Sequence, residues 1–295
     1  MTIDPHLQIN REIRPRAAGV KLYTIIGCIF VTQVVAGEGV DPGDESCFHV
    51  NGVTAHRGNS SLYPENTLRA FRSAIEVGVD WMECDILKTR DGKIVVIHDK
   101  DTGRVGDRNL RIAESTYDEL RQVDVAFDFR RRTGRTLAEC PIAAAPLLED
   151  VIRLTMTQRR TRLSIQPKMD IVDEAIELIR EMKAESWVGF NEGSFDRVRR
   201  VKELAPEVTV FYDTNGKDTE LHVERAMKHG FEGIVMRRDN ITVEDIEIIH
   251  RADLEAGAWT VNEEEEMKRL KGMGVDRIYT NFPAALLSLQ QAMTP

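Results

Sequence analysis

The sequence predicts a (β/α)8, or TIM, barrel, and three observations lead to this prediction. Apolar strand patterns alternate with helical patterns eight times after residue 52, and strict alternation of this kind produces a parallel sheet. The eight units occupy about 250 residues, the usual size of such a barrel. Polar residues follow the strands, whose carboxyl ends form the active face of this fold. An open doubly wound sheet is disfavoured because no glycine-rich nucleotide loop follows the first strand.

The first two units contain a helix between the strands and a hairpin after the second strand. Apolar residues recur at helical spacing between 64 and 77, and Gly78 ends this helix. Asp91-Gly92 is typical of a two-residue hairpin turn, and counting back from it places Asp85 opposite His98. The expected elements are a strand at 53–55, a helix at 64–77, a strand at 81–87 and a returning arm at 94–97.

An irregular segment at 99–146 separates these units from the other six. It has no clean periodicity beyond a short helix at 115–123, and its three arginines at 130–132 are typical of a solvated surface. We therefore expect a small insertion after the second strand that caps one end of the barrel. The later strands are expected at 163–166, 187–190, 208–212, 233–236, 258–261 and 277–280, and the helices at 147–156, 171–182, 195–204, 220–229, 243–254, 263–273 and 284–292.

Composition limits the partners and the covalent framework of the chain. Its 295 residues carry a formal net charge of −9 and give a pI near 5.4. Nothing resembles a basic stripe, so no nucleic-acid partner is expected, and an anionic substrate must be held by local cations. The four cysteines are too few and too scattered for a disulfide framework or a zinc cage. The sequence does not indicate an oligomeric state.

Residues 1–46 are expected to form an extension outside the barrel domain at 47–295. Basic residues between 11 and 21 precede an apolar run at 22–36, which ends in small residues. This pattern is typical of a secretory signal, and the run is too short and interrupted to indicate a membrane span. We expect an exported protein whose only membrane association would be through this segment, and N-terminal sequencing tests this. A lipoprotein box at Cys28 and a packed helix in a cytoplasmic protein are the alternatives.

Oxygen-bearing side chains follow the second and third strands. Glu83 and Asp85 lie two residues apart on one strand and therefore point to the same face. Together with the amide oxygen of Gln166 they form an all-oxygen set suited to Mg²⁺ or Ca²⁺. Zinc would favour more nitrogen or sulfur ligands. The sequence therefore predicts a hard divalent cation as cofactor.

Two histidines and two cations complete this cluster. His56 and His98 each follow an apolar run, and beside a hard metal they are better suited to acid–base catalysis than to metal binding. Arg57 and Lys168 supply the planar fork and the point charge that commonly surround a phosphate. The set indicates phosphodiester cleavage, in which cations offset charge on the phosphoryl oxygens while the histidines take and give a proton.

A series of short motifs runs from about residue 52 to the C-terminus. The chain contains, in order, HRG at 56–58, PENT at 64–67, E-x-D at 83–85, HD at 98–99, a strand ending in Lys168, SF at 194–195, WTVN at 259–262 and GVD…TN between 274 and 281. In this order the motifs resemble those of one enzyme family, the glycerophosphodiester phosphodiesterases.

The resemblance implies a function and roles for individual residues. It implies metal-dependent hydrolysis of glycerophosphodiesters to glycerol 3-phosphate and an alcohol, on a barrel with a small insertion after the second strand. A glycerol hydroxyl would attack phosphorus and give a cyclic phosphate, which avoids most of the entropic cost of a bimolecular attack. The implied roles are acid–base catalysis for His56 and His98, metal binding for Glu83 and Asp85, phosphate binding for Arg57 and Lys168, support of the histidine loop for Glu65 and Asn66, and a substrate-pocket wall for Trp259.

Two positions depart from the family pattern. Gln166 stands where a glutamate is usual, so the site loses one negative charge and is expected to bind metal more weakly. Gln166→Glu is accordingly expected to tighten metal binding. Asn281 stands where an aspartate is frequent, and we expect it to lie behind the residues that contact substrate.

Other functions remain open on the same barrel. A sphingomyelinase D-like or phospholipase D-like lyase would use the same histidines and metal on a lipid, but the intact PENT segment and the lack of an apolar loop favour a small diester. A non-catalytic phosphate-binding barrel would explain Gln166 as a sign of decay. A mere binder, however, has no need of an acid–base pair.

Overall fold

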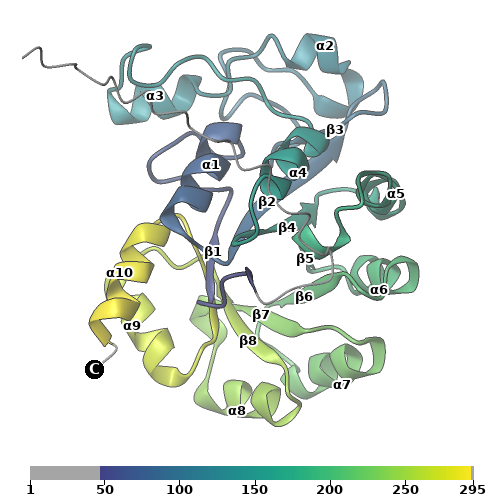
Figure 1. The fold of residues 1–295 in the computed structure, drawn as a ribbon, viewed down its shortest axis with the longest axis vertical. Coiled ribbons are helices and arrows are strands. Elements are labelled where there is room, and N and C mark those ends of the chain that lie inside the picture. Colours follow the sequence, from purple (N-terminus) through teal and green to yellow (C-terminus); the bar gives the residue numbers. More distant parts are fainter. Residues whose placement is uncertain (1–46, 294–295) are drawn as a thin grey trace, which may run out of the picture. The chain divides into compact units, whose positions relative to one another are not determined.

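The computed structural model describes residues 47–293, in which eight parallel strands close into a barrel (Figure 1). The first strand, β1, pairs with both β2 and β9, which closes the sheet. The strands are β1 (Val53–Ala55), β2 (Trp81–Lys88), the antiparallel arm β3 (Ile94–Val96), β4 (Arg162–Pro167), β5 (Val188–Glu192), β6 (Thr209–Thr214), β7 (Gly233–Arg237), β8 (Glu255–Trp259) and β9 (Arg277–Thr280). The prediction of a (β/α)8 barrel is confirmed.

Helices follow the parallel strands and cover the outside of the barrel (Figure 1). They are α1 (Leu68–Val77), α4 (Leu148–Met156), α5 (Val172–Met182), α6 (Phe195–Leu204), α7 (Thr219–His229), α8 (Val243–Arg251), α9 (Glu264–Met273) and α10 (Pro283–Met293). Two further helices, α2 (Tyr117–Leu120) and α3 (Phe127–Thr133), lie in the insertion between β3 and α4, and short 3-10 turns occur at Ile112–Glu114, Glu185–Trp187 and Arg238–Asn240. The apolar faces of the barrel helices and the outward-facing strand residues form one large core. Each fully buried large side chain contributes about 1.5–3 kcal/mol, so this packing holds the strand ends in place.

Alternation along β2 separates the barrel interior from the helical layer. Met82 and Cys84 belong to the core shared with the helices, whereas Trp81 packs against residues inside the barrel. Glu83 and Asp85 lie on the same side of the strand as Trp81 and are 1% and 0% exposed. The second strand therefore carries two carboxylates to the mouth of the barrel, as its sequence predicts.

The hairpin arm differs from the predicted register by one residue. Asp85 stands opposite Ile97, whose N–H donates to the Asp85 carbonyl oxygen at 2.9 Å, and not opposite His98. The turn has three residues, 90–92, because Gly92 adopts the left-handed conformation with φ +79°. A left-handed glycine at the end of a three-residue loop is a common hairpin connection. The loop beyond β3, rather than the ladder, therefore sets the direction of His98.

The boundary between α8 and β8 differs from the prediction. The helix predicted to end at residue 254 ends at Arg251, because Asp253 adopts a left-handed φ of +58°. The strand predicted at 258–261 consequently begins at Glu255, and Trp259 is its last residue. This shift places the indole at the active face of the barrel.

The insertion between β3 and α4 has a small apolar core of its own. Val105, Leu120 and Val123 are buried there against the hairpin. The helix predicted at 115–123 is shorter, and α3 was not predicted. Its arginines pair with acidic residues close by in sequence, Arg130 with Asp124 and the next two with Asp128 of the same helix, so local ion pairs rather than apolar periodicity support this helix.

The expected N-terminal extension, with its possible signal or anchor, lies outside the described residues. Between residues 47 and 293 the structure has no helix with the length and apolar character needed to span a membrane.

Candidate active site

The chain turns sharply after β1, and this turn positions His56. Arg57 and Gly58 both have positive φ, +57° and +75°. A Cβ atom on Gly58 would lie 2.7 Å from the backbone carbon of Ala70 in α1, so only glycine fits there. The left-handed Arg57 is held because its N–H donates to Glu83 Oε2 at 2.9 Å. Strain of this kind persists only where the surroundings impose it, which is typical of functional sites.

The ring of His56 has a defined tautomer. Its Nδ1 lies 2.8 Å from Asn281 Oδ1, which also accepts a hydrogen bond from Ser60 Oγ at 3.0 Å. Because the amide oxygen is an acceptor, Nδ1 carries the proton and Nε2 keeps its lone pair. Burial, reinforced by the charge of Arg57, lowers the pKa of His56 to about 4. The imidazole is therefore neutral near pH 7 and suited to accept a proton.

Asn281→Asp should raise the pKa of His56, since a carboxylate beside Nδ1 stabilises the imidazolium. We expect the acid limb of the kcat/KM profile, which reports the free enzyme, to move to higher pH. Asn281→Ala removes the acceptor without adding charge and serves as the control. An unchanged acid limb in Asn281→Asp would show that His56 does not set it.

The PENT segment packs against the end of the second strand. Asn66, which also has a positive φ of +56°, donates from Nδ2 to Asp85 Oδ2 at 2.8 Å and accepts from the Asp85 N–H at 3.3 Å. The Arg57 guanidinium lies 2.9 Å from Glu65 Oε1 and 3.2 Å from Asp85 Oδ2. Glu65 and Asn66 therefore fix Arg57 and Asp85 from behind the cavity.

His98 is held by a carboxylate that the insertion orients. Its Nδ1 lies 2.6 Å from Asp99 Oδ1, and Arg104 donates from Nε to Asp99 Oδ2 at 2.5 Å. The same guanidinium donates to both oxygens of Glu65, at 2.6 and 2.9 Å. Arg104 thus joins the partner of His98 to the partner of Arg57. The two histidines differ in that His56 meets a neutral amide and His98 meets an anion.

The two carboxylates of β2 have opposite electrostatic environments. Burial, together with the neighbouring charge of Asp85, raises the pKa of Glu83 to about 8. Burial alone would also raise the pKa of Asp85, but the Lys168 and Arg57 charges lower it below its usual value. Glu83 Oε1 is buried and accepts no hydrogen bond from the described residues. Glu83 also lines the cavity described below, so this oxygen is placed where a ligand could contact it.

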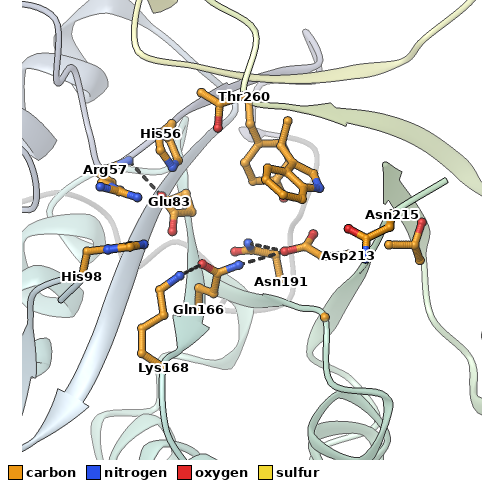
Figure 2. Close-up of a pocket in the computed structure, with 14 residues that line it drawn as sticks. His56, Arg57, Glu83, His98, Gln166, Lys168, Asn191, Asp213, Asn215 and Thr260 are labelled. Atoms are coloured by element: carbon orange, nitrogen blue, oxygen red, sulfur yellow. Dashed lines mark hydrogen bonds between the residues drawn. The ribbon is translucent and has the colours of Figure 1, made fainter. Parts of the chain in front are cut away.

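A chain of polar contacts crosses the next three strands (Figure 2). Lys168 Nζ lies 2.9 Å from Asp85 Oδ1 and also donates to Gln166 Oε1. On its other side Gln166 donates from Nε2 to Asp213 Oδ2 at 2.9 Å, and Asn191 Nδ2 donates to the same oxygen at 3.1 Å. Burial raises the pKa of Asp213 to about 7. The phosphate-binding candidate Lys168 is therefore coupled to a third acidic group.

These side chains surround a cavity of about 430 Å³ at the carboxyl ends of the strands (Figure 2). A cavity of this size suits a small-molecule ligand. The Trp259 indole lines it, and its Nε1 is buried without a hydrogen-bond partner among the described residues. The cavity is lined by His56, Arg57, Glu83, His98, Gln166, Lys168, Asn191, Gly193, Asp213, Thr214, Asn215, Trp259, Thr260 and Tyr279.

The structure brings the predicted site residues together in two layers. Seven of them line the cavity, and the other three, Glu65, Asn66 and Asp85, contact those seven or each other from behind. Asp99, Arg104, Asn191 and Asp213 were not assigned roles from sequence. The position of Asn191 and Asp213 at strand ends was a usable signal, whereas Arg104 lies in the irregular insertion and had none.

The chain is similar to a known protein family and to bacterial enzymes of known name. The family model described as "Glycerophosphoryl diester phosphodiesterase family" matches residues 56–285. A glycerophosphodiester phosphodiesterase of Bacillus altitudinis is 27% identical over 82% of this chain and 98% of its own length. One from Caldanaerobacter subterraneus is 28% identical over 80% of this chain and 96% of its own.

Solved structures share the fold. A phosphodiesterase of Oleispira antarctica, solved with the product sn-glycerol-3-phosphate, has a TM-score of 0.70 at 23% identity and covers 82% of this chain and 97% of its own. A glycerophosphodiester phosphodiesterase of Agrobacterium tumefaciens has a TM-score of 0.68 at 20% identity, covering 81% and 99%. From the match over residues 56–285, this chain belongs to the glycerophosphoryl diester phosphodiesterase family, a family of phosphoric diester hydrolases.

Proposed function

We propose that this protein hydrolyses glycerophosphodiesters to glycerol 3-phosphate and an alcohol by acid–base catalysis between two histidines. The observation that supports this most is that the two histidines have different partners. His56 contacts the neutral amide of Asn281 and His98 contacts the carboxylate of Asp99, and both line one cavity with the cations Arg57 and Lys168. The relatives named above and the product in the Oleispira structure support glycerol 3-phosphate as the product.

The unequal pairing assigns the two proton transfers. His56 is neutral with a free Nε2, so it acts as the base that takes a proton from the attacking hydroxyl. The Asp99 carboxylate can stabilise positive charge on His98, as the aspartate of a catalytic triad does for its histidine. His98 therefore acts as the acid that protonates the leaving oxygen.

The proposed reaction has two steps, formation of a cyclic phosphate and its hydrolysis. In the first, the glycerol 2-hydroxyl oxygen attacks phosphorus, His56 takes its proton, the bond to the leaving alcohol breaks, and His98 gives that alcohol a proton. In the second, water opens the cyclic phosphate while His98 takes a proton from it and His56 returns one to the 2-oxygen. Among the described residues, those that line the cavity include no serine or cysteine that would serve as an alternative nucleophile.

The residues around Glu83 fit a divalent cation. No group of three or more His, Cys, Asp or Glu side chains within residues 47–293 could by itself hold a metal. Glu83 Oε1 has no partner among the described residues, and Asp85 Oδ1 and the Gln166 amide oxygen both lie beside Lys168. These three atoms nevertheless offer only hard oxygen ligands, the kind that Mg²⁺ and Ca²⁺ take. When bound, such an ion would stabilise negative charge on the phosphoryl oxygens. Arg57 and Lys168 add fixed positive charge to the same cavity.

Release of glycerol 3-phosphate from glycerophosphocholine tests the proposal. We expect turnover with Mg²⁺ or Ca²⁺, loss of most activity in EDTA, and none above background in His56→Ala. Glu83→Gln should reduce cation affinity, measured by calorimetry, by about 10-fold or more, the range seen when groups around a bound metal are altered. Activity that is unchanged in EDTA and in Glu83→Gln would contradict the metal role, and a lack of any turnover would favour the non-catalytic alternative.

A lipid substrate is the second candidate. The insertion exposes apolar side chains that the sequence did not indicate as a surface patch, with Leu137 59% and Ile142 71% exposed. Lysophosphatidylcholine and sphingomyelin therefore belong in the same assay. Faster turnover of either lipid than of glycerophosphocholine would favour the lyase-like alternative.

A further inference from the structure

We propose that Asp213 is a positioning residue that holds the Gln166 amide with its oxygen toward the Glu83 and Asp85 carboxylates. This inference rests on the proposed function, because it concerns how the chain's own residues prepare the cation site.

The orientation of the Gln166 amide follows from its two neighbours. Lys168 on one side is an ammonium, which can only donate, and Asp213 on the other side is a carboxylate, which accepts. The amide therefore has one satisfactory orientation, with Oε1 toward Lys168 and Nε2 donating to Asp213 Oδ2 at 2.9 Å. Without Asp213, Nε2 would lose its acceptor and the amide could rotate.

Asp213 is itself held in place from a neighbouring strand. Asn191 Nδ2 donates to Asp213 Oδ2 at 3.1 Å, and the side-chain amide oxygen of Asn191 accepts from Ser164 Oγ at 2.7 Å. These donors and acceptors run in one direction, from Ser164 on β4 through Asn191 on β5 to Asp213 on β6, and Figure 2 shows the contact between the last two. Groups behind metal ligands commonly orient them in this way.

The same contact makes residues 166 and 213 interdependent. A glutamate at 166 would bring an acceptor oxygen to the position from which Nε2 now donates, 2.9 Å from Asp213. Two carboxylates at that distance repel unless they share a proton. The tighter metal binding expected for Gln166→Glu should therefore develop fully only when Asp213 is also changed.

A double-mutant cycle measures this coupling through cation affinity. Mg²⁺ and Ca²⁺ are titrated calorimetrically into the wild type, Gln166→Glu, Asp213→Asn and the double variant at pH 7.5. In the wild-type background, we expect Asp213→Asn to weaken binding about 10-fold, because an asparagine can present either its oxygen or its NH2 group to Gln166 and no longer fixes the amide in one orientation. In the Gln166→Glu background, the same substitution should tighten binding instead. A residue that merely supported the fold would not reverse its effect with the side chain at 166.

Melting temperatures in EDTA and a charge-matched variant control the cycle. Gln166→Glu should melt below the double variant, because only the single variant opposes two carboxylates. Asp196→Asn changes net charge equally at a side chain that is 86% exposed and should act alike in both backgrounds.

Three outcomes would overturn the inference. Asp213→Asn acting in the same direction in the wild-type and Gln166→Glu backgrounds would remove the coupling. A raised KM with unchanged cation affinity would make Asp213 a substrate contact instead. A wild type that binds neither cation would overturn the metal role and this inference together. A wild type that binds a cation, with effects of the two substitutions that simply add, would overturn this inference alone.

Discussion

His98→Ala is expected to slow the release of choline from glycerophosphocholine by about 10²–10⁴-fold, yet to leave the release of 4-nitrophenolate from glyceryl 4-nitrophenyl phosphate in the first step nearly unchanged. Choline is a poor leaving group and needs a proton as the ester bond breaks. In the proposed mechanism that proton comes from His98, whose Nδ1 lies 2.6 Å from Asp99 Oδ1. The 4-nitrophenolate ion leaves without one. Single-turnover rates of choline and 4-nitrophenolate release by the same preparation measure the contrast, because they report the first step alone.

His56→Ala provides the complementary result. In the proposed mechanism its Nε2 takes the proton of the attacking hydroxyl, which both substrates share, so both rates should fall by about 10²–10⁴-fold. Circular dichroism and melting temperature establish that each variant is folded. If the activated substrate rescued His56→Ala rather than His98→Ala, the base and the acid would be exchanged. Equal loss on both substrates in both variants would exclude a separate acid role for His98.

The barrel, and the placement of the strand-end residues at one face, could be predicted from the sequence because both depend on local periodicity, whereas Glu65, Asn66 and Trp259 were assigned roles only through the family resemblance. The two-residue repeat of β2 carries Glu83 and Asp85 inward while Cys84 faces the helices. Parallel strands bring their carboxyl ends to one face, so residues after successive strands had to converge. No distance information is needed for either step.

Other features depended on tertiary contacts that no local pattern contains. A left-handed Gly92 changed the turn by one residue and with it the partner of Asp85. Arg104 reaches Asp99 and Glu65 from an insertion whose course follows its own small core. Such a residue is recognisable only once the fold has brought its partners together.

The departure at Gln166 illustrates the same limit. Read alone, a neutral amide in a metal site indicates weakened binding. In the folded chain it donates to Asp213, 47 residues later in sequence. A loss of charge at one position is therefore accompanied by a carboxylate beside it, and only the three-dimensional contact reveals that the two must be interpreted together.

Removal of the glycerol 2-hydroxyl should nearly abolish turnover. If that hydroxyl is the nucleophile, a phosphocholine diester of propane-1,3-diol should react at least about 10³-fold more slowly than glycerophosphocholine, since well-placed internal nucleophiles have effective concentrations of about 10⁵–10⁸ M. The phosphocholine diester of propane-1,2-diol also lacks one hydroxyl but keeps the attacking one, and it should retain most of the rate. Phosphorus NMR should detect a five-membered cyclic phosphate during turnover of the reactive pair.

Rapid hydrolysis of the diester that lacks the 2-hydroxyl would point to a different nucleophile. Among the described residues, the cavity lining offers only a few protein hydroxyls, so water is the main alternative. Rapid hydrolysis of the propane-1,3-diol diester without a cyclic species would mean that water attacks phosphorus directly. Direct attack would incorporate oxygen from labelled water in the only chemical step, with inversion at phosphorus. The two-step route gives retention, since two inversions cancel. Stereochemistry at a chiral phosphorus therefore separates the routes even if both diesters react.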